Sequence, residues 1–359
     1  MTVADVHHLV DTARRVPPPA DAAPADTVPL LSLAELSRAA GLTSWLVKRA
    51  IPTVAIGMLF GASQTFKSFI ALDCALHVAH GLPWMGRRTR KGAVIYIAAE
   101  GGAGMWKRID AWHRSRGLPW NRVSFHVVPV ALDLAADAMK VVASASAVGV
   151  KPALVVVDTV SQTYAGEENS ANEMAAYLRA LGQAFRDLWS CAVLLIHHAG
   201  HQATERPRGS SAITSNVDFL FGSHRDEKEM LATLSCLKQK DEERFADQTF
   251  ALSVKELGTD SDGDTITSLV ARHLSTEQEI REALAGEQTA GRAGRAQLLL
   301  GLVQTGMAEK ELRLAFCTEL GGLDAEAKRK AFYRARNWAV QSKLIEVAQG
   351  VIIDLRERQ

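Results

Sequence analysis

The chain has 359 residues, a formal net charge of +1, 47% hydrophobic residues and 23% charged residues. This composition is ordinary for a globular protein with a sizeable core, and the small net charge excludes a strongly basic nucleic-acid coat or a long acidic tail. Four widely separated cysteines form no CxxC pair, which argues against a zinc ribbon or a disulfide framework. No apolar run reaches the roughly 20 residues that span a bilayer, and the N-terminus lacks a signal-peptide pattern. We therefore expect a cytoplasmic protein.

The N-terminal 50 residues divide into two predicted segments. Residues 1–27 are rich in Pro, Ala and Asp, and such a stretch cannot bury enough apolar surface to offset the entropy lost on ordering. A disordered tail is therefore predicted. Residues 28–50 predict a helical lead-in that runs from Leu30 to Lys48, with Ser32 and Thr43 as caps.

Residues 51–275 alternate between predicted strands and helices. The strands are continuous apolar runs, which indicates that helices cover both of their faces. The predicted strands are 55–60, 93–98, 123–128, 154–157 and 192–196, and the predicted helices are 69–80, 105–116, 137–148 and 171–188. Segments 249–255 and 265–272 flank a polar turn and predict a β-hairpin. The sequence thus predicts an α/β core with a mostly parallel sheet.

Residues 276–359 have a different pattern, because the predicted elements are helices until the last strand pair. The segment from Leu344 to Ile353 contains Gln349-Gly350 at its centre, which is typical of a hairpin turn. Helices followed by a hairpin predict a small winged-helix-like domain.

A glycine-containing loop follows the first predicted strand of the core. Residues 61–68 have the sequence GASQTFKS and open a predicted helix. Backbone N–H groups of such a loop, together with the helix N-terminus, form a pocket for phosphate oxygens. Lys67 would reach the β- and γ-phosphates of ATP, and the Ser68 hydroxyl would ligate Mg²⁺. The alternative is an ordinary strand–loop–helix junction. The predicted nucleotide-binding residues are Gly61, Ala62, Ser63, Gln64, Thr65, Phe66, Lys67, Ser68, Phe69 and Asp158.

One residue of this loop departs from the common pattern, which has Gly immediately before the Lys. Phe66 occupies that position, and its Cβ would crowd the turn around the phosphates. A nucleotide-binding protein with damaged catalysis therefore stays open as an alternative.

Three other strands end in polar residues. The carboxyl ends of parallel strands meet at one edge of the sheet, where ligands bind. Asp158 would hold Mg²⁺ through a water molecule, or would cap a helix instead. Glu100 would act as the general base for the attacking water, or would be a loop residue beside two glycines. His197 and His198 would contact the γ-phosphate and report its loss; a zinc site is disfavoured because no acidic partner has metalloprotease spacing.

Five sequence segments together resemble RecA-type P-loop ATPases, and in particular the RepA-like hexameric replicative helicases of plasmids and phages. The segments are GASQTFKS, VIYIAAEGG, ALVVVDT, LLIHHAG and RGSSA, and the resemblance covers roughly residues 45–255. It implies that Lys67 and Ser68 bind phosphate and Mg²⁺, that Glu100 is the catalytic base and that Asp158 is the Walker-B acid. The His-His pair would be the sensor.

The resemblance also implies a ring with ATP between subunits, completed by a basic finger from the neighbouring subunit. Where the plasmid helicase has its finger arginine, this chain has Asp218. A basic residue in this role would offset charge that develops on the phosphate, and each candidate could equally be a solvated charge. The candidates are Lys238, Lys240, Arg208 and Arg225.

Two segments could contact DNA. In rings of this kind, loops after the Asp and His strands line the pore, and here the second loop carries Arg206 and Arg208. The C-terminal domain has a basic segment interleaved with aromatic residues, which would bind phosphates or would be a solvated face beside an aromatic core. Its basic residues are Lys328, Arg329, Lys330, Arg334 and Arg336.

These features favour one functional hypothesis over two others. The first is an ATP- and Mg²⁺-dependent helicase or translocase that acts on single-stranded DNA as a hexameric ring, in replication of a phage, plasmid or mobile element. The second is a RecA-like DNA-binding ATPase, such as a recombination mediator or loader, without unwinding. The third is a catalytically weak nucleotide-binding regulator whose C-terminal domain binds DNA.

Overall fold

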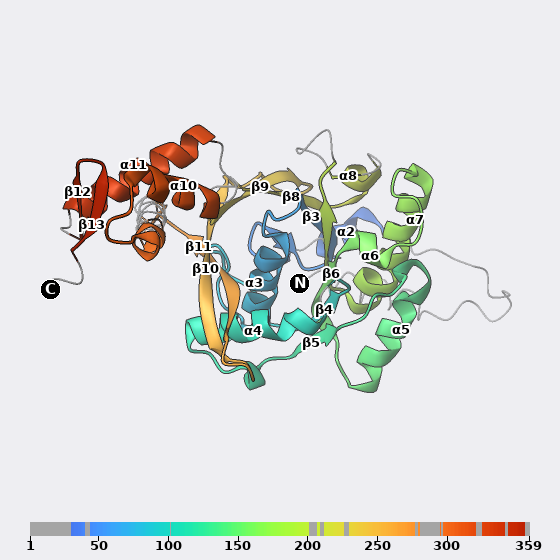
Figure 1. Ribbon diagram of the computed structural model, residues 1–359. Coiled ribbons are helices and arrows are strands. Elements are labelled where there is room, and N and C mark those ends of the chain that lie inside the picture. The colour runs from blue at the N-terminus through green and yellow to red at the C-terminus, as the bar shows by residue number, and fades with distance from the viewer. Residues whose placement is uncertain are drawn as a thin grey trace, which may run out of the picture. The chain divides into compact units, whose positions relative to one another are not determined.

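The computed structural model describes residues 30–39, 44–100, 102–200, 207–208, 212–225, 230–276, 279–280, 295, 297–320, 325–341 and 344–355 (Figure 1). The predicted tail at residues 1–27, the predicted cap Thr43 and the pore-loop residue Arg206 lie outside this set. The chain divides into two compact units, Met1–Thr276 and Glu277–Gln359. Within the described residues, no helix is long and apolar enough to cross a membrane.

Within the described part of the first unit, nine strands form one sheet, in the order β11-β10-β9-β8-β3-β7-β6-β4-β5. The six strands from β8 to β5 run parallel, and β9, β10 and β11 extend the sheet in antiparallel fashion. The parallel strands are β3 (Ala55–Gly61), β4 (Ala93–Ala98), β5 (Phe125–Val128), β6 (Pro152–Asp158), β7 (Ala192–His198) and β8 (Phe219–His224). The antiparallel strands are β9 (Leu231–Gln239), β10 (Gln248–Thr259) and β11 (Thr265–Leu274). The predicted α/β core with a mostly parallel sheet is confirmed.

Helices cover both faces of the parallel strands (Figure 1). The α3 and α4 side has one apolar cluster, and the α5 and α7 side has another. Successive side chains of a strand alternate between these clusters, so Leu59 packs toward α3 while Met58 and Phe60 pack toward α5 and α7. The helices are α3 (Lys67–His80), α4 (Gly102–Arg116), α5 (Leu134–Ala147), α6 (Val160–Thr163), α7 (Ala171–Leu181) and α8 (Ala212–Asn216), with a short 3-10 turn η1 (Trp120–Arg122) and a π-helical turn η2 (Gly182–Asp187) that continues α7.

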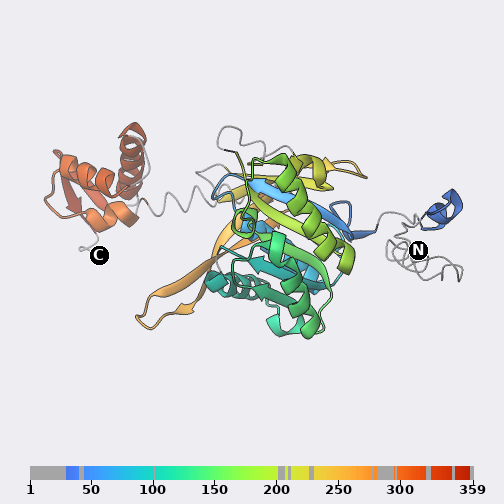
Figure 2. The same cartoon turned by 90° about the vertical axis from the view of Figure 1, so that its right-hand side faces the viewer.

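The β10–β11 hairpin is longer than the sequence predicts. Its ten paired positions join residues 249–259 to 265–274, and the hairpin projects from the body of the unit (Figure 2). The register shifts between Glu256 and Gly258, where Gly258 has φ 139° and introduces a bulge. The predicted hairpin is confirmed, with this extension.

Two parts of the fold differ from the sequence prediction. The predicted helix from Leu30 to Lys48 is wrong beyond α2 (Leu33–Ala39), because Trp45–Val47 forms strand β1 and pairs with β2 (Ile51–Pro52). Aromatic and branched side chains favour the extended backbone, and Leu46 and Val47 are fully buried there. Strands β8 and β9 were not predicted at all, because their mixed polar and apolar residues give a weak strand pattern.

The second unit has its own small core. Helices α10 (Glu309–Glu319) and α11 (Ala325–Gln341) pack with the strands β12 (Ile345–Ala348) and β13 (Val351–Asp354). Gln349 and Gly350 connect these strands with φ values of 54° and 80°, the left-handed geometry of a tight hairpin turn. The predicted hairpin is confirmed. The winged-helix assignment of the whole unit stays a prediction.

Candidate active site

The loop between β3 and α3 is held by contacts to its own residues and to β8. The Thr65 hydroxyl donates to the carbonyl of Ala62 at 2.9 Å, and the buried Ser223 hydroxyl of β8 donates to the carbonyl of Thr65 at 2.6 Å. A side chain at Gly61 would meet the carbonyl oxygen of Ser223 at 2.3 Å. The sequence therefore needs glycine where the loop leaves the strand.

Phe66 stands immediately before the first residue of α3 and adopts a left-handed backbone, with φ 63° and ψ 18°. This conformation explains why the common pattern has glycine at this position. The aromatic ring does not fold back over the loop. It packs edge-on against Phe69, with ring centroids 6.3 Å apart, and lies 4.2 Å from the guanidinium carbon of Arg225.

Lys67 is the most buried charged side chain of the loop, with 6% of its surface exposed. Its Nζ donates to the carbonyl of Ala62 at 2.6 Å. Burial lowers the pKa of Lys67 to about 8, although the carboxylates of Asp158 and Glu100 act in the opposite direction. The ammonium group therefore lies in a pocket that favours an added anion.

Asp158 ends β6 and faces α3, because it has the same parity along the strand as Leu154 and Val156. Its two oxygens accept hydrogen bonds from the hydroxyls of Ser68 at 3.0 Å and Tyr96 at 2.7 Å. Burial raises the pKa of Asp158, and these two hydrogen bonds oppose the rise. A carboxylate and a serine hydroxyl at hydrogen-bond distance are the oxygen donors that Mg²⁺ prefers, so the residues fit the predicted ion.

Glu100 lies just beyond the end of β4, at the same edge of the sheet. Its Oε1 accepts a hydrogen bond from the Thr159 hydroxyl at 2.6 Å and lies 3.7 Å from Nε2 of His198. The pKa of Glu100 is lowered, and the largest cause is the contact with the His198 side chain. The Thr159 hydrogen bond and the charge of Lys67 lower it further, whereas burial acts in the opposite direction. Glu100 is therefore ionised at neutral pH and can accept a proton from water.

The two histidines at the end of β7 face opposite sides of the sheet. His198 lies on the loop side and lines the same cavity as Lys67. His197 is fully buried; its ring Nε2 lies 2.8 Å from the carbonyl oxygen of Arg208, and within the described residues its Nδ1 has no hydrogen-bond partner. Burial lowers the pKa of His197. Only one of the two predicted sensor residues thus lies at the candidate site.

Several of these side chains line one cavity of about 340 Å³, whereas Asp158 and His197 are not among its lining residues. From the predicted set the lining includes Ser63, Gln64, Phe66, Lys67, Ser68, Phe69, Glu100, His198 and the finger candidate Arg225, and the structure adds Arg108 and Thr159. Sequence reasoning assigned no role to Arg108 or Thr159. Thr159 directly follows Asp158, and Arg108 lies two turns into the helix after Glu100, so their positions beside predicted strand ends could have indicated them.

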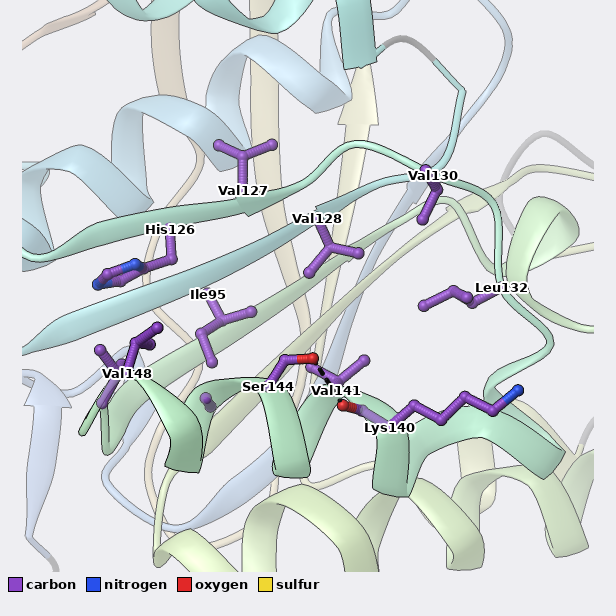
Figure 3. Close-up of a pocket in the computed structure, with 12 residues that line it drawn as sticks. Ile95, His126, Val127, Val128, Val130, Leu132, Lys140, Val141, Ser144 and Val148 are labelled. Atoms are coloured by element: carbon purple, nitrogen blue, oxygen red, sulfur yellow. Dashed lines mark hydrogen bonds between the residues drawn. The ribbon is translucent and has the colours of Figure 1, made fainter.

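A second cavity of about 380 Å³ lies between the edge strand β5 and α5 (Figure 3). Figure 3 shows Ile95, Val128 and Val141 along it. Its lining is mostly aliphatic, and it includes none of the predicted site residues. Lys140 is the one lysine or arginine among its lining residues, and it pairs with Asp137 at 2.8 Å. This cavity is therefore not part of the candidate site.

Each described candidate for a trans-acting finger contacts groups of its own chain. Arg208 pairs with Glu168 at 2.6 Å, and Nζ of Lys238 donates to the backbone carbonyl of Thr214 at 2.9 Å. Lys240 lies 3.4 Å from the carboxylate of Asp218. Arg225 lines the cavity of its own chain's loop, which places it in cis to that loop.

The predicted basic segment of the second unit forms α11. Arg329, Lys330 and Arg334 are exposed on it, Lys328 is half-buried, and Arg336 pairs with Glu309 at 3.3 Å. Lys330 pairs with Glu326 one turn earlier. Among the interleaved aromatics, Phe332 is fully buried in the core, whereas Tyr333 and Trp338 are exposed by 39% and 45%. The segment therefore combines a packed face with an exposed basic and aromatic face.

The fold and the loop define a class of protein. A parallel α/β sheet, a strand–loop–helix with Lys67 and Ser68 at the helix start, and Asp158 two strands away form a RecA-like P-loop core. Residues 27–204 match a family model described as "AAA domain", and this segment contains the loop, Glu100, Asp158 and both histidines.

A solved structure with a similar fold is the crystal structure of the RadB recombinase. It is 18% identical in sequence, the match covers 55% of this chain and 86% of that chain, and the TM-score is 0.42. No curated protein matches the chain.

Proposed function

We propose that this protein is a helicase or translocase of the RepA-like type, which hydrolyses Mg²⁺-ATP as a hexameric ring to move on single-stranded DNA. The observation that supports it most is the position of Glu100: an ionised carboxylate, held by Thr159, lines the same cavity as Lys67 and Ser68. A site that only bound nucleotide would not need a base at this position. The roles proposed for Lys67, Ser68, Asp158 and Glu100 in hydrolysis are as follows.

Lys67 and the loop N–H groups would hold the phosphates, and Ser68 and Asp158 would hold the metal ion. Bound Mg²⁺ would neutralise charge on the phosphate oxygens. Exchange of the Lys67 contact from the Ala62 carbonyl to a phosphate would replace a neutral acceptor by an anion, which favours the charged amine.

Glu100 would take a proton from the attacking water. Its Oε1 already accepts from Thr159, and this contact fixes the carboxylate beside the cavity. His198 lies 3.7 Å from the same oxygen. A change in the charge or position of Glu100 during the reaction would therefore alter its interaction with His198 at the end of β7. The segment after β7 would carry that change toward DNA.

DNA contact in this proposal involves the exposed face of α11 as well as the segment after β7. Arg329 and Arg334 are exposed beside Tyr333 and Trp338. Cationic side chains bind phosphates, and aromatic rings stack on bases of a single strand. We propose that neighbouring subunits complete the ATP site, with Lys238, Lys240 or Arg208 as the finger.

A second candidate function is a RecA-like DNA-binding ATPase, such as a recombination mediator or loader, that does not unwind DNA. One observation favours it. Arg208, Lys238 and Lys240 all make contacts within their own chain, so a finger contact would require each of them to leave its present partner. A DNA-binding ATPase without a ring has no such requirement.

Steady-state ATP hydrolysis, measured with and without single-stranded DNA, tests the proposal. We expect turnover to rise with DNA, and Glu100→Gln to lower it at least 100-fold while nucleotide binding persists, because a general base contributes about 10²–10⁴ in rate. Glu173→Gln, an exposed acidic residue in α7, is the control for loss of one carboxylate.

Strand displacement on a forked duplex separates the two candidates. ATP-dependent displacement supports the helicase, whereas DNA-stimulated hydrolysis without displacement supports the mediator or loader. Nucleotide binding without hydrolysis under either condition contradicts both and favours a nucleotide-binding regulator.

A further inference from the structure

Phe66 is an unusual residue for its backbone position. It holds a left-handed conformation at the start of α3, with φ 63°, where glycine carries no steric penalty. An aromatic side chain at this position raises the question of what its ring contributes. The ring packs against the edge of the apolar core on the α3 side, and it also lines the cavity.

The ring of Phe66 lies 4.2 Å from the guanidinium carbon of Arg225, a cation–π distance. Arg225 directly follows β8, the strand beside β3. Its Nη1 also donates to the backbone carbonyl of Gln64 at 3.3 Å. Two contacts to the loop, one to a ring and one to a carbonyl, therefore place this guanidinium over the loop of its own chain.

A second aromatic–arginine pair stands next to the first. The guanidinium carbon of Arg108 lies 4.8 Å from the ring of Phe69, and the rings of Phe66 and Phe69 meet edge-on. All four side chains line the cavity that contains Lys67. A guanidinium is planar and has five donors, so an aromatic ring under one face does not occupy the donors at its edge. For Arg225 the acceptors at this edge include the Gln64 carbonyl and, at 3.8 Å, the Met230 sulfur.

We propose that Phe66 is a positioning residue, whose ring holds the guanidinium of Arg225 over the cavity so that Arg225 contacts the nucleotide bound by the same chain. Arg225 thus acts in cis rather than as a finger toward a neighbouring subunit. The inference rests on the proposed binding of ATP at this loop. The inference assigns a function to Phe66, which occupies the position where the common pattern has glycine.

The competing explanation is that Phe66 is a tolerated defect in the loop. The two explanations predict opposite results for Phe66→Gly. If the ring is a defect, glycine relaxes the backbone and nucleotide binds as well or better. If the ring positions Arg225, glycine weakens binding despite the relaxed backbone.

The test measures the dissociation constant of a fluorescent ATP analogue for the full chain, by anisotropy. Phe66→Gly and Phe66→Leu are expected to weaken binding about fivefold, since both remove the aromatic face. Leucine keeps the apolar bulk and the strained backbone, so it separates loss of the ring from relief of strain. Phe66→Tyr keeps the ring and should bind within twofold of the parent.

Arg225→Ala is expected to weaken binding about tenfold, because a hydrogen bond from a charged donor is lost. The double variant Phe66→Leu with Arg225→Ala should match Arg225→Ala alone, since the ring acts through the arginine. Additive losses in the double variant, or full affinity in Phe66→Gly, overturn the inference.

Two matched controls lie away from the cavity. Ser190 also has a left-handed backbone, with φ 51°, so Ser190→Gly relieves similar strain elsewhere. Arg88 is exposed, and Arg88→Ala removes one positive charge. Both should bind as the parent does, and the melting temperature of each variant without nucleotide checks that it folds.

Lys67→Ala distinguishes the failure of this inference from the failure of the proposed function. If the parent binds the ATP analogue and Lys67→Ala does not, the proposed nucleotide site stands, and the Phe66 and Arg225 variants decide the inference alone. If the parent and Lys67→Ala bind equally, the loop is not the nucleotide site and both proposals fail.

Discussion

Two buried aspartates of the first unit have opposite surroundings. Asp73, in the middle of α3, is 1% exposed, and Asp158, at the end of β6, is 5% exposed. Both accept two or more side-chain hydrogen bonds. Asp73 has a cation among its partners, whereas the hydrogen-bond donors of Asp158 are two hydroxyls. The comparison distinguishes Asp73, whose charge is neutralised within the fold, from Asp158, which we propose as a ligand of a metal ion.

Asp73 connects α3 to α4 and to the segment after α3. Its oxygens accept from the indole N–H groups of Trp84 at 3.1 Å and Trp112 at 2.7 Å, and Arg116 donates at 2.7 Å. His77 lies 3.5 Å away on the next turn of the helix. The carboxylate charge is therefore compensated within the protein, as the burial of an ion requires.

Asp158 has no such compensation from its two donors. The hydroxyls of Ser68 and Tyr96 stabilise the carboxylate without neutralising it, and burial raises its pKa. A buried anion that lacks a cation in contact is costly to the folded protein by itself. Under the proposed function, a bound Mg²⁺ ion would supply the positive charge that these two hydroxyls lack.

The largest expected effect tests this contrast through stability. Asp73→Asn should lower the free energy of unfolding by about 2 to 3 kcal/mol, because the half-buried Arg116 loses its charged hydrogen-bond partner. Asp158→Asn should change it by no more than about 1 kcal/mol, because the amide oxygen still accepts a hydrogen bond and the lost attraction to Lys67 is offset by removal of a buried charge. Urea denaturation without nucleotide measures both.

In Mg²⁺-dependent nucleotide binding, Asp158→Asn should have the larger effect of the two variants. Asp158→Asn should lose the Mg²⁺ dependence, and Asp73→Asn should keep it at temperatures where it is folded. Equal loss of stability in the two variants would contradict the distinction between a structural and a ligand-binding carboxylate.

A second prediction concerns pH, through Lys67. Its pKa is about 8 without nucleotide, so the amine is mostly protonated at pH 7 and mostly neutral at pH 9. Bound phosphate favours the protonated form and raises this pKa, so binding above pH 8 takes up a proton. Affinity should therefore fall as pH rises above about 8, approaching tenfold per pH unit.

Calorimetry in buffers with different heats of ionisation detects the proton uptake. Lys67→Arg is the matched control, because a guanidinium stays protonated throughout this range. The arginine variant should bind more weakly but with little pH dependence between 8 and 9.5. The same pH dependence in both proteins would assign the titration to another group.

The smallest expected effect comes from Tyr96→Phe. It removes a hydrogen bond of 2.7 Å to Asp158 and should cost about 1 to 2 kcal/mol of stability. It should also raise the Mg²⁺ concentration needed for half-maximal hydrolysis, because the carboxylate loses one of the donors that favour its charged form. Tyr177→Phe removes a buried hydroxyl contact of 2.9 Å to Thr163 and should affect stability alone.

Much of the core was predictable because its determinants are local. Continuous apolar runs gave the five predicted parallel strands, and the loop ending in Lys67 and Ser68 marked the start of α3. The alternation of side chains along a strand would even have separated the two histidines, since only one residue of an adjacent pair can face the loop. The sequence analysis predicted both His197 and His198 at the site, whereas only His198 lines the cavity.

Other features depended on elements that are distant in the chain. Tyr96 lies in the middle of a strand and belongs to no recognisable sequence motif. Its hydroxyl reaches Asp158 because β4 and β6 are neighbours in the sheet. Asp73 gave no indication of its role for the same reason, since its partners come from three separate segments. Arg225 was one of four candidates for a finger toward a neighbouring subunit, and it lines the cavity beside its own loop.

Local patterns were enough to predict the α/β class, the candidate phosphate-binding loop and the acidic residues that follow the strands, because periodicity and strand ends are properties of short segments. Which of these residues meet depends on the tertiary structure. Strand order brought Tyr96 to Asp158, and the pairing of β8 with β3 brought Arg225 to Phe66. Such contacts follow from how layers pack, and no local pattern records which strands become neighbours.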